Sequence, residues 1–456
     1  MNHKKSRKYF GTDGIRGKVG KFPITAEIAL KIGIAVGVKF SSANNQKLHR
    51  VVIGKDTRLS GYVIESAITA GLASVGIEVF LVGPLPTPAI SMITKSMRAD
   101  IGIMISASHN PYYDNGIKIF DGNGNKLSDE MELEIEALID SDLTNNFSTD
   151  RNLGRVKRIE DARGRYIEFV KNSFPKDKSL EGLRIVVDCA NGASYSIAGT
   201  IFNELGADTI IINNQPDGFN INEECGSTHL KSLQDKVKLV KADIGIALDG
   251  DADRLAVVDE NGEVVHGDKI IALIAEELHS SGLLKQDKVV ITQMSNLAIE
   301  KYLEYLGIST IRVGVGDRYV LEGIKNNNCN FGGEQSGHIV LSDFSSTGDG
   351  LVASLKLLSI LKSSGKKMSD LAKIFNLNPQ VLVNIKIANR GYSPLENQDV
   401  LNLIKQEEEK IKKNGRILVR KSGTENLIRI MVEGENEEQI NIIAEKIANF
   451  IKQKDQ

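Results

Sequence analysis

Short apolar runs rich in β-branched residues recur along the chain, and each ends in a loop that contains Gly, Asn or Asp. The clearest are VVIGKDTR from Val51, IGIMISASHN from Ile101, RIVVDCANGA from Arg184, DIGIALDGDADR from Asp243 and KVVITQMSN from Lys288. Stretches with a helical pattern lie between them, including residues 25–40 and 131–139. This alternation predicts repeated strand-loop-helix units with parallel or mixed sheets. Ligands in such sheets gather at the loops after the strands' carboxyl ends, so we expect the chemistry there.

The C-terminal part of the chain has a different pattern. Two strands are expected at residues 416–420 and 427–432, joined by a glycine-containing loop and followed by a helix that carries Ile440, Ile443, Ile447 and Phe450 at helical spacing. This pattern predicts a small α+β domain. Polar or turn-forming segments at residues 141–152, 259–262 and 375–379 are candidate domain boundaries. A length of 456 residues favours about three domains, within a range of about two to four.

Composition places the protein among soluble globular proteins, with 41% hydrophobic and 25% charged residues. A formal net charge of -2 gives no basic field for nucleic acid or anionic membranes. No apolar run reaches the roughly eighteen residues of a membrane span, and the first residues do not read as a secretory signal, so a cytoplasmic location is expected. The three cysteines, Cys189, Cys225 and Cys329, are too few and too scattered for a disulfide framework, and buried thiols are expected.

The sequence DGDADR places Asp249, Asp251 and Asp253 directly after an apolar strand. In an extended loop, carboxylates at every second position converge and repel one another unless a cation lies between them. Oxygen ligands favour a hard cation such as Mg²⁺. An EF-hand is excluded because Arg254 stands where the calcium loop turns on glycine. The alternative to a metal site is a solvated acidic turn without a bound ion.

Two further loops carry groups that suit a phosphorylated sugar. In RKSGTENLIR, from Arg420 to Arg429, a Ser-Gly-Thr turn between basic residues offers N–H groups, hydroxyls and guanidinium groups to a phosphate. In GGEQSGH, Glu334 and Ser336 suit hydrogen bonds to sugar hydroxyls, and His338 suits proton transfer near neutral pH. Each loop by itself would more often be an ordinary surface turn. Glycine-containing loops add further cations at Arg16, Lys55 and Arg58.

The stretch SASHNPYYDNGIK, residues 106–118, places Ser108 beside His109, as in a hydrolase. Pro111 biases the residue before it toward extended conformations, and in an extended segment adjacent side chains point to opposite faces. His109 is therefore expected to face away from Ser108.

The acidic and basic loops together favour phosphoryl transfer over acyl transfer. Because GVGD at Gly314 lacks the rest of a GxGxxG fingerprint, a phosphorylated serine is a better candidate donor than ATP.

The sequence resembles the α-D-phosphohexomutases over essentially its whole length. The motifs of that family occur here in the same order: FGTDGIRG at residues 10–17, SASHNPYYDNGIK at 106–118, DGDADR at 249–254, GGEQSGH at 332–338 and RKSGTEN at 420–426. FGTDGIRG, Gln335 and FNINEECGSTH at residues 219–229 resemble the branch that acts on glucosamine phosphates. The branch that acts on mannose and glucose phosphates stays open as an alternative, as do a non-catalytic phosphosugar-binding protein and a magnesium-dependent phosphatase.

The resemblance implies an α/β fold of four domains around a central cleft. Three domains would share a mixed α/β topology and the fourth would be a smaller α+β domain. The expected bounds are residues 1–155 with the phosphoserine loop, 156–259 with the metal loop, 260–375 with the sugar-reading loop and 376–456 with the phosphate clamp. The implied reaction interconverts glucosamine 6-phosphate and glucosamine 1-phosphate through a phosphoserine and a 1,6-bisphosphate, feeding amino-sugar nucleotide and cell-wall precursor synthesis.

The resemblance also implies roles for individual residues. Ser108 would be the modified residue, a phosphoserine whose phosphate binds one Mg²⁺ per chain together with Asp249, Asp251 and Asp253. Arg16, Lys118, Arg254 and His338 would surround the reacting oxygen. Substrate would be bound by Glu334, Ser336, Arg420, Ser422, Gly423, Thr424 and Arg429. A phosphosugar is the expected partner, with a sugar bisphosphate or a kinase to prime the serine; no nucleic acid or membrane is expected, and the oligomeric state is open.

One position departs from the family pattern. Asn426 stands where the clamp loop usually has proline. Asparagine frees φ and restores an N–H, so we expect a more mobile loop and a modest effect on binding.

Overall fold

The structure is a computed structural model, which describes residues 7–11, 13–41, 49–386, 394–412, 414–421 and 427–455. The chain divides into two compact units. The first comprises Met1–Thr292 and Thr310–Lys373, and the second comprises Gln293–Ser309 and Ile374–Gln456.

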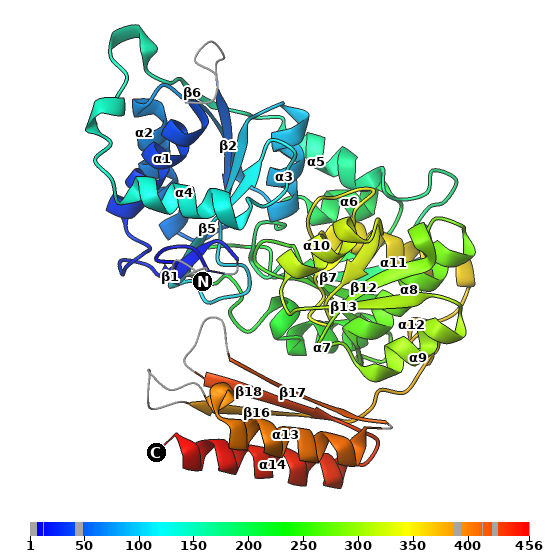
Figure 1. The fold of residues 1–456 in the computed structure, drawn as a ribbon. Coiled ribbons are helices and arrows are strands. Elements are labelled where there is room, and N and C mark those ends of the chain that lie inside the picture. Colours follow the sequence, from blue (N-terminus) through cyan, green and yellow to red (C-terminus); the bar gives the residue numbers. More distant parts are fainter. Residues whose placement is uncertain are drawn as a thin grey trace. The chain divides into compact units, whose positions relative to one another are not determined.

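The first sheet of the first unit has six strands in the order β1-β5-β4-β2-β3-β6 (Figure 1). The strands are β1 (Ile15–Lys18), β2 (Arg50–Lys55), β3 (Glu78–Pro84), β4 (Ile101–Ile105), β5 (Asp114–Asp121) and β6 (Val156–Arg158). Strand β2 pairs parallel with β3 and β4, whereas β5 is antiparallel to β4 and β1. All residues of β4 are buried, as its unbroken apolar sequence predicts for a strand covered on both faces.

Two smaller sheets complete the first unit. One has the strand order β11-β10-β9-β7-β8 and the other β13-β12-β14-β15. Their strands are β7 (Arg184–Asp188), β8 (Asp208–Ile212), β9 (Ile244–Leu248), β10 (Leu255–Asp259), β11 (Val264–Val265), β12 (Lys288–Thr292), β13 (Ser309–Val313), β14 (Phe331–Gly333) and β15 (Ile339–Leu341). Both sheets combine parallel and antiparallel pairs. The expected mixed sheets are therefore present.

Helices pack against these sheets (Figure 1). In the first unit they are α1 (Ala26–Ser41), α2 (Ser60–Ser74), α3 (Thr87–Ser96), α4 (Asp129–Ile139), α5 (Ala162–Lys171), α6 (Ala198–Glu204), α7 (Lys231–Val240), α8 (Gly267–Ser280), α10 (Asp317–Asn326), α11 (Gly350–Ser364) and α12 (Met368–Leu371). Helices α1 and α2 cross closely because glycines face each other there: a Cβ on Gly33 would lie 2.4 Å from the carbonyl oxygen of Ile68. The two helices predicted in this unit correspond to α1 and α4.

The second unit contains an antiparallel sheet in the order β16-β18-β17, with helices on one face (Figure 1). Its elements are α9 (Leu297–Tyr305), β16 (Gln380–Lys386), α13 (Gln398–Ile411), β17 (Arg416–Lys421), β18 (Leu427–Glu433) and α14 (Glu437–Lys454). Ile440, Ile443 and Ile447 of α14 are buried against the sheet, and Phe450 is partly buried. The predicted strands, helix and α+β class of this region are confirmed, with strand ends that differ by one residue.

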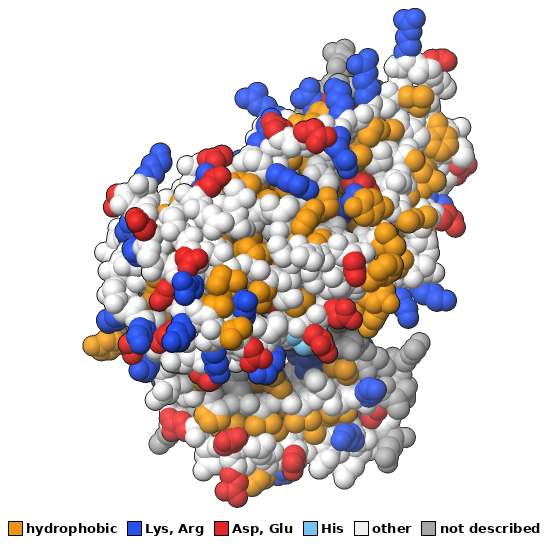
Figure 2. All heavy atoms as spheres, turned by 180° about the vertical axis from the view of Figure 1, so that it is seen from behind, with side chains coloured by type: hydrophobic (Ala, Val, Ile, Leu, Met, Phe, Trp, Pro, Cys, Tyr) orange, Lys and Arg blue, Asp and Glu red, His pale blue; other side chains and the backbone are white. Residues whose placement is uncertain are grey.

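Other sequence-based expectations have mixed outcomes. All three cysteines are buried, as expected. The described residues form four separate sheets with helices beside them, in agreement with the expected α/β class of four domains, while the domain bounds stay a prediction. Among the described residues, no helix has the length and apolar character needed to cross a membrane. On the face drawn in Figure 2, acidic and basic side chains are interspersed, in keeping with the small net charge.

Candidate active site

Ser108 lies in the loop that follows β4, at the carboxyl end of that strand. Its side chain is buried, and its Oγ donates a hydrogen bond of 2.5 Å to Oδ2 of Asp249, 141 residues further along the chain. The backbone of Ser108 is left-handed, with φ at +53°. Few residues other than glycine adopt this region, and such strain persists only where surrounding contacts hold it, often at functional sites.

The expectation that His109 faces away from Ser108 is wrong. The Nδ1 atom of His109 lies 3.3 Å from the Oγ of Ser108. The alternation of side chains applies only to extended backbone, and the left-handed φ of Ser108 turns both side chains to the same side. Burial lowers the pKa of His109 to about 4, and the nearby cations Arg254 and Arg16 contribute. At neutral pH the ring is uncharged.

The three aspartates of DGDADR converge after β9 as predicted. Asp249, Asp251 and Asp253 are buried, and each offers a carboxylate oxygen within 4.8 Å of the others. The segment is a turn with φ of +54° at Ala252, where the prediction assumed an extended loop. Thr87, the first residue of α3, helps to hold the turn: its N–H donates to the Asp251 carbonyl at 2.9 Å and its hydroxyl to Oδ2 of Asp251 at 2.6 Å.

The acidic cluster fits a hard divalent cation. The Oδ1 atoms of Asp251 and Asp253 are buried, and neither accepts a hydrogen bond from a described residue. Burial, together with the neighbouring carboxylates of Asp253 and Asp251, raises the pKa of Asp249 well above 3.8. Three carboxylates at this separation repel one another, and oxygen atoms oriented toward a common point are the ligands that Mg²⁺ prefers.

Lys118 of β5 provides a cation beside the cluster. Its Nζ lies 2.9 Å from Oδ2 of Asp251, 3.2 Å from Oδ2 of Asp253 and 3.6 Å from Asp13. Burial alone would lower the pKa of this lysine, but the carboxylates of Asp13, Asp251 and Asp253 raise it well above 10.5. Lys118 is therefore charged, and it contacts the Oδ2 atoms of Asp251 and Asp253.

The two predicted arginines lie close to the same cluster. Arg16 of β1 contacts Asp13 and donates to the Ala107 carbonyl at 3.4 Å. The N–H of Arg254 donates to Oδ1 of Asp249 at 3.1 Å, and its Nε lies 4.0 Å from Oδ1 of Asp253. Both guanidinium groups are partly exposed. They can add positive charge where a phosphate would be held.

An ion-pair chain next to Lys118 was missed by the sequence reasoning. Asp13 contacts Lys126 as well as Arg16, and Lys126 in turn contacts Asp317 at the start of α10. Asp13 lies within FGTDGIRG and Asp317 within GVGD, whereas Lys126 lies in neither motif. No local pattern indicates, however, that positions 113 and 191 residues apart meet.

The GGEQSGH loop brings two of its three predicted residues into the interior. Glu334 is buried and its Oε1 accepts the N–H of Gly316 at 2.9 Å, while the side chain of Ser336 is exposed. Nδ1 of His338 lies 3.8 Å from Oδ1 of Asp253, and Nε2 accepts the N–H of Gly348 at 3.2 Å. Burial would lower the pKa of His338, but Asp253 outweighs it and raises the pKa above 6.5. His338 therefore contacts an aspartate of the acidic cluster.

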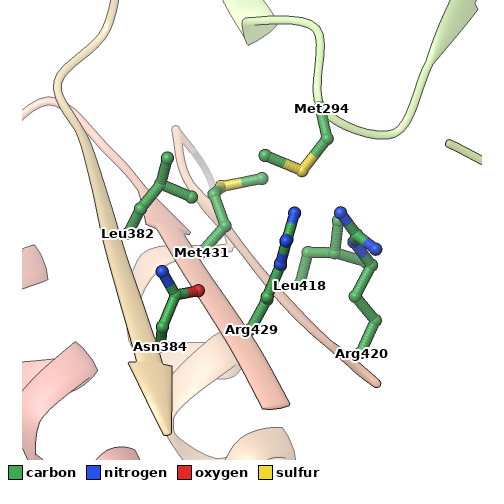
Figure 3. A pocket seen from close by; sticks show the side chains of 7 residues that line it. All are labelled: Met294, Leu382, Asn384, Leu418, Arg420, Arg429 and Met431. Atoms are coloured by element: carbon green, nitrogen blue, oxygen red, sulfur yellow. The ribbon is translucent and has the colours of Figure 1, made fainter. Parts of the chain in front are cut away.

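The second unit contains the two described arginines of the predicted clamp. Arg420 of β17 and Arg429 of β18 are directly opposite each other in the sheet. They line a pocket of about 220 Å³ together with Asn384 of β16 and four apolar side chains, and Figure 3 shows their guanidinium groups side by side; the apolar residues are Met294, Leu382, Leu418 and Met431. Like charges opposite each other weaken a sheet, so the pair favours a bound anion. Ser422, Gly423, Thr424 and Asn426 lie outside the described residues.

The cations predicted at Lys55 and Arg58 have a different role from the one expected. Both side chains are completely buried. Lys55 contacts Glu65 and lies 4.1 Å above the ring of Tyr62, and Arg58 contacts Asp56 and several backbone carbonyls. Neither is open to a ligand in this structure. Glycine-rich surroundings suggested exposure, but the apolar strand before them carries both residues inward.

Comparisons with known proteins agree with the motifs. Four family models for phosphoglucomutase/phosphomannomutase match: α/β/α domain I at residues 7–146, domain II at 164–262, domain III at 266–377 and the C-terminal domain at 382–450. A protein named phosphoglucosamine mutase from Mesorhizobium japonicum is 54% identical over 443 residues, which cover 97% of this chain and 98% of that protein. One of the same name from Caulobacter vibrioides is 54% identical over 446 residues, covering 98% and 99%.

Solved structures show the same fold at lower identity. A phosphoglucomutase/phosphomannomutase family protein from Burkholderia thailandensis aligns with a TM-score of 0.80 at 24% identity, covering 97% of both chains. The N-acetylphosphoglucosamine mutase of Aspergillus fumigatus, solved in complex with GlcNAc-6P and magnesium, aligns with a TM-score of 0.68 at 19% identity over 99% of this chain and 96% of that one. The chain belongs to the phosphoglucomutase/phosphomannomutase family, as its ordered motifs predicted.

Proposed function

We propose that the protein is a phosphoglucosamine mutase, which interconverts glucosamine 6-phosphate and glucosamine 1-phosphate through a 1,6-bisphosphate. The observation that carries the proposal is the buried hydroxyl of Ser108, 2.5 Å from Asp249 within a cluster of three aspartates. The named relatives that are more than half identical over almost the full chain support the choice of glucosamine. A cytoplasmic location remains part of this proposal.

Ser108 is the phosphoryl carrier in this mechanism. The bond from phosphorus to its Oγ breaks, a bond from phosphorus to sugar O1 forms, and the proton of the sugar hydroxyl replaces the phosphoryl group on Oγ. The bisphosphate then turns around, and the phosphoryl group on O6 returns to Ser108 by the same exchange. Each half-reaction uses one site for the transferred group, so the protein must bind the sugar in two orientations.

Charge is managed by groups of opposite sign around Ser108. Asp249, Asp251 and Asp253 would hold one Mg²⁺ with an oxygen of the phosphoserine, and the metal would neutralise charge on the transferred group. Lys118 keeps two of the three carboxylates in place and adds a fixed positive charge. Arg254, the last residue of the metal loop DGDADR, adds a second positive charge. For His338, proton transfer stays a prediction, because both ring nitrogens face protein groups here.

Glu334 and Ser336 bind sugar hydroxyls in this proposal, and Arg420 and Arg429 bind the phosphate that is not transferred, together with Ser422, Gly423 and Thr424. A site made of two guanidinium groups binds the phosphate and not the sugar ring. It therefore accepts the 1-phosphate and the 6-phosphate alike. This property is what a reaction with two substrate orientations requires.

The Arg429→Gln variant is expected to raise KM for glucosamine 6-phosphate about 10- to 100-fold with little change in kcat, since one charge-assisted hydrogen-bond donor is lost. Thermal unfolding of Arg429→Gln, measured alongside, checks that the variant is folded. Lys421→Gln, which removes an exposed cation from β17, the strand that pairs with β18, is the matched control and should leave KM within about twofold. An unchanged KM in Arg429→Gln would exclude the clamp.

Substrate choice is tested by kcat/KM values for glucosamine 6-phosphate, glucose 6-phosphate and mannose 6-phosphate under one set of conditions. We expect glucosamine 6-phosphate to be preferred by at least about tenfold, equivalent to about 1.4 kcal/mol. A preference for glucose or mannose phosphate would assign the protein to the other branch. Stoichiometric release of inorganic phosphate would identify a phosphatase, and absence of turnover with all three sugars would favour a binding protein.

A further inference from the structure

Arg58 is a buried guanidinium whose donors all point at the protein backbone and one carboxylate. Its Nε donates to Oδ2 of Asp56 at 2.8 Å. The other four N–H groups face the carbonyls of Ser108 at 3.0 Å, Asn110 at 2.8 Å, Asp114 at 3.1 Å and Pro111. An arginine side chain has five N–H groups, so Asp56 and the loop that carries Ser108 together saturate Arg58.

Asn222 reaches the same loop from a distant part of the chain. It lies in FNINEECGSTH, between β8 and α7, and its side chain is buried. Its Nδ2 donates to the carbonyl of Ser108 at 2.9 Å and to that of Asn110 at 3.0 Å. These are two of the carbonyls that Arg58 also contacts. We call Arg58 and Asn222, with the carbonyls of Ser108 and Asn110, the carbonyl bracket.

The backbone N–H of Ser108 is held as well. It donates to the hydroxyl of Ser106 at 2.9 Å, and that hydroxyl donates to Oδ2 of Asp56 at 2.7 Å. Asp56 is the partner of Arg58, so one buried network fixes both polar groups of the Ser108 backbone. A left-handed conformation is unfavourable for serine, and these contacts hold Ser108 in it.

The bracket also contacts the metal loop. A Cβ added to Gly250 of DGDADR would lie 2.6 Å from the Ser108 carbonyl oxygen and 2.9 Å from Nδ2 of Asn222. Gly250 therefore packs directly on the bracket, next to Asp249, whose carboxylate receives the Ser108 hydroxyl. The bracket holds the Ser108 backbone and also packs against Gly250, the neighbour of Asp249. Both contacts therefore bear on the distance between the Ser108 Oγ and the acidic cluster.

We propose that Asn222 and Arg58 are positioning residues for phosphoryl transfer, which hold the Ser108 loop at the distance that the acidic cluster requires. The proposal rests on the carrier role of Ser108 proposed above. Neither residue touches the reacting atoms, so their loss will lower the rate of transfer without weakening the affinity for the sugar phosphate. Asn222 lies in FNINEECGSTH, the segment whose sequence resembles the branch of the family that acts on glucosamine phosphates.

Asn222→Asp is the decisive variant. Aspartate has the size of asparagine and tolerates the left-handed φ of +59° at this position, but it has no N–H to donate and places an oxygen against two carbonyls. We expect kcat to fall about 100-fold, with KM for glucosamine 6-phosphate within about threefold of the wild-type value. Asn222→Ala, which removes the donors without adding repulsion, should give a smaller loss of kcat in the same direction.

Asn220→Ala is the matched control. Asn220 lies in the same loop, and its side-chain hydrogen bonds stay within that loop: Nδ2 donates to the Gln215 carbonyl at 3.0 Å and Oδ1 accepts the Asp217 N–H at 3.1 Å. Its kcat should stay within about twofold of wild type. The bracket is excluded if the wild type is active and both Asn222 variants keep kcat within about twofold, or if Asn220→Ala loses as much as they do.

Arg58→Lys tests the other half of the bracket. Lysine keeps the charge but presents one nitrogen, which cannot reach acceptors arranged for a planar fork. We measure the folded fraction by circular dichroism and calculate kcat per folded molecule. We expect kcat to fall as in Asn222→Asp, with KM unchanged. A rise in KM as large as the fall in kcat would contradict a positioning role. An inactive wild-type protein, by contrast, would contradict the proposed function and not the bracket alone.

Discussion

The Ser108→Ala variant will lose mutase activity by about four orders of magnitude or more and will stay folded. Ser108 Oγ is the atom that carries the phosphoryl group in the proposed reaction, and alanine offers no replacement. Removal of one hydroxyl from a site that also contains Lys118 and three carboxylates costs little packing. The measurements are a coupled assay for glucosamine 1-phosphate, thermal unfolding, and peptide mass spectrometry, which should find one phosphate on Ser108 in wild type and none in the variant.

Ser106→Ala separates the two serines of the motif. It removes the acceptor for the Ser108 N–H but leaves the Ser108 hydroxyl, so we expect a reduced rate with phosphate still found on Ser108. Substantial activity in Ser108→Ala, or phosphate on Ser106, would overturn the assignment of the carrier. An unphosphorylated wild type would not, provided that incubation with a sugar 1,6-bisphosphate restores the phosphate and the activity.

Removal of divalent metal with EDTA will abolish activity, and added Mg²⁺ will restore it. In the protein, Asp251→Asn should lower kcat by about 1000-fold and raise the Mg²⁺ concentration needed for half activity, because one anionic ligand is lost from the cluster. Asparagine can still accept the hydrogen bonds that Oδ2 of Asp251 receives from Thr87 and Lys118, so the variant chiefly loses the charge.

Asp243→Asn is the control for charge alone. Asp243 precedes β9, whereas the acidic cluster follows the same strand, and its Oδ2 accepts the N–H of Arg184 at 2.7 Å. We expect kcat and the Mg²⁺ requirement to stay at wild-type values. Full activity of the metal-free protein, or of Asp251→Asn without added metal, would show that the cluster does not serve the reaction.

Much of the local structure followed from the sequence. Strands such as β4 and β9 are unbroken apolar runs, and the spacing of Ile440, Ile443 and Ile447 predicted the buried face of α14. The acidic cluster was predictable because its three members are neighbours in sequence and any turn after the strand brings them together. When all residues of a site are close together in the sequence, their proximity in the structure can be predicted from the sequence.

Contacts between distant segments were not predictable in the same way. The position of His109 depends on the left-handed φ of Ser108, which tertiary contacts impose on a residue that would otherwise avoid it. The burial of Arg58 depends on carbonyls that the loop presents only after it folds. Periodicity and propensity describe the surroundings of a residue along the chain, whereas these features depend on residues 50 or more positions away.

The saturation of Arg58 also constrains the length of the loop that it holds. Four of its acceptors are carbonyls between Ser108 and Asp114, and each fits one N–H of a rigid plane. An insertion or deletion of one residue there would shift the carbonyls out of register and leave buried N–H groups unpaired, at about 1 to 3 kcal/mol for each. Tyr112 and Tyr113 on this loop are exposed, and we expect substitutions there to cost less stability than a change in the number of residues.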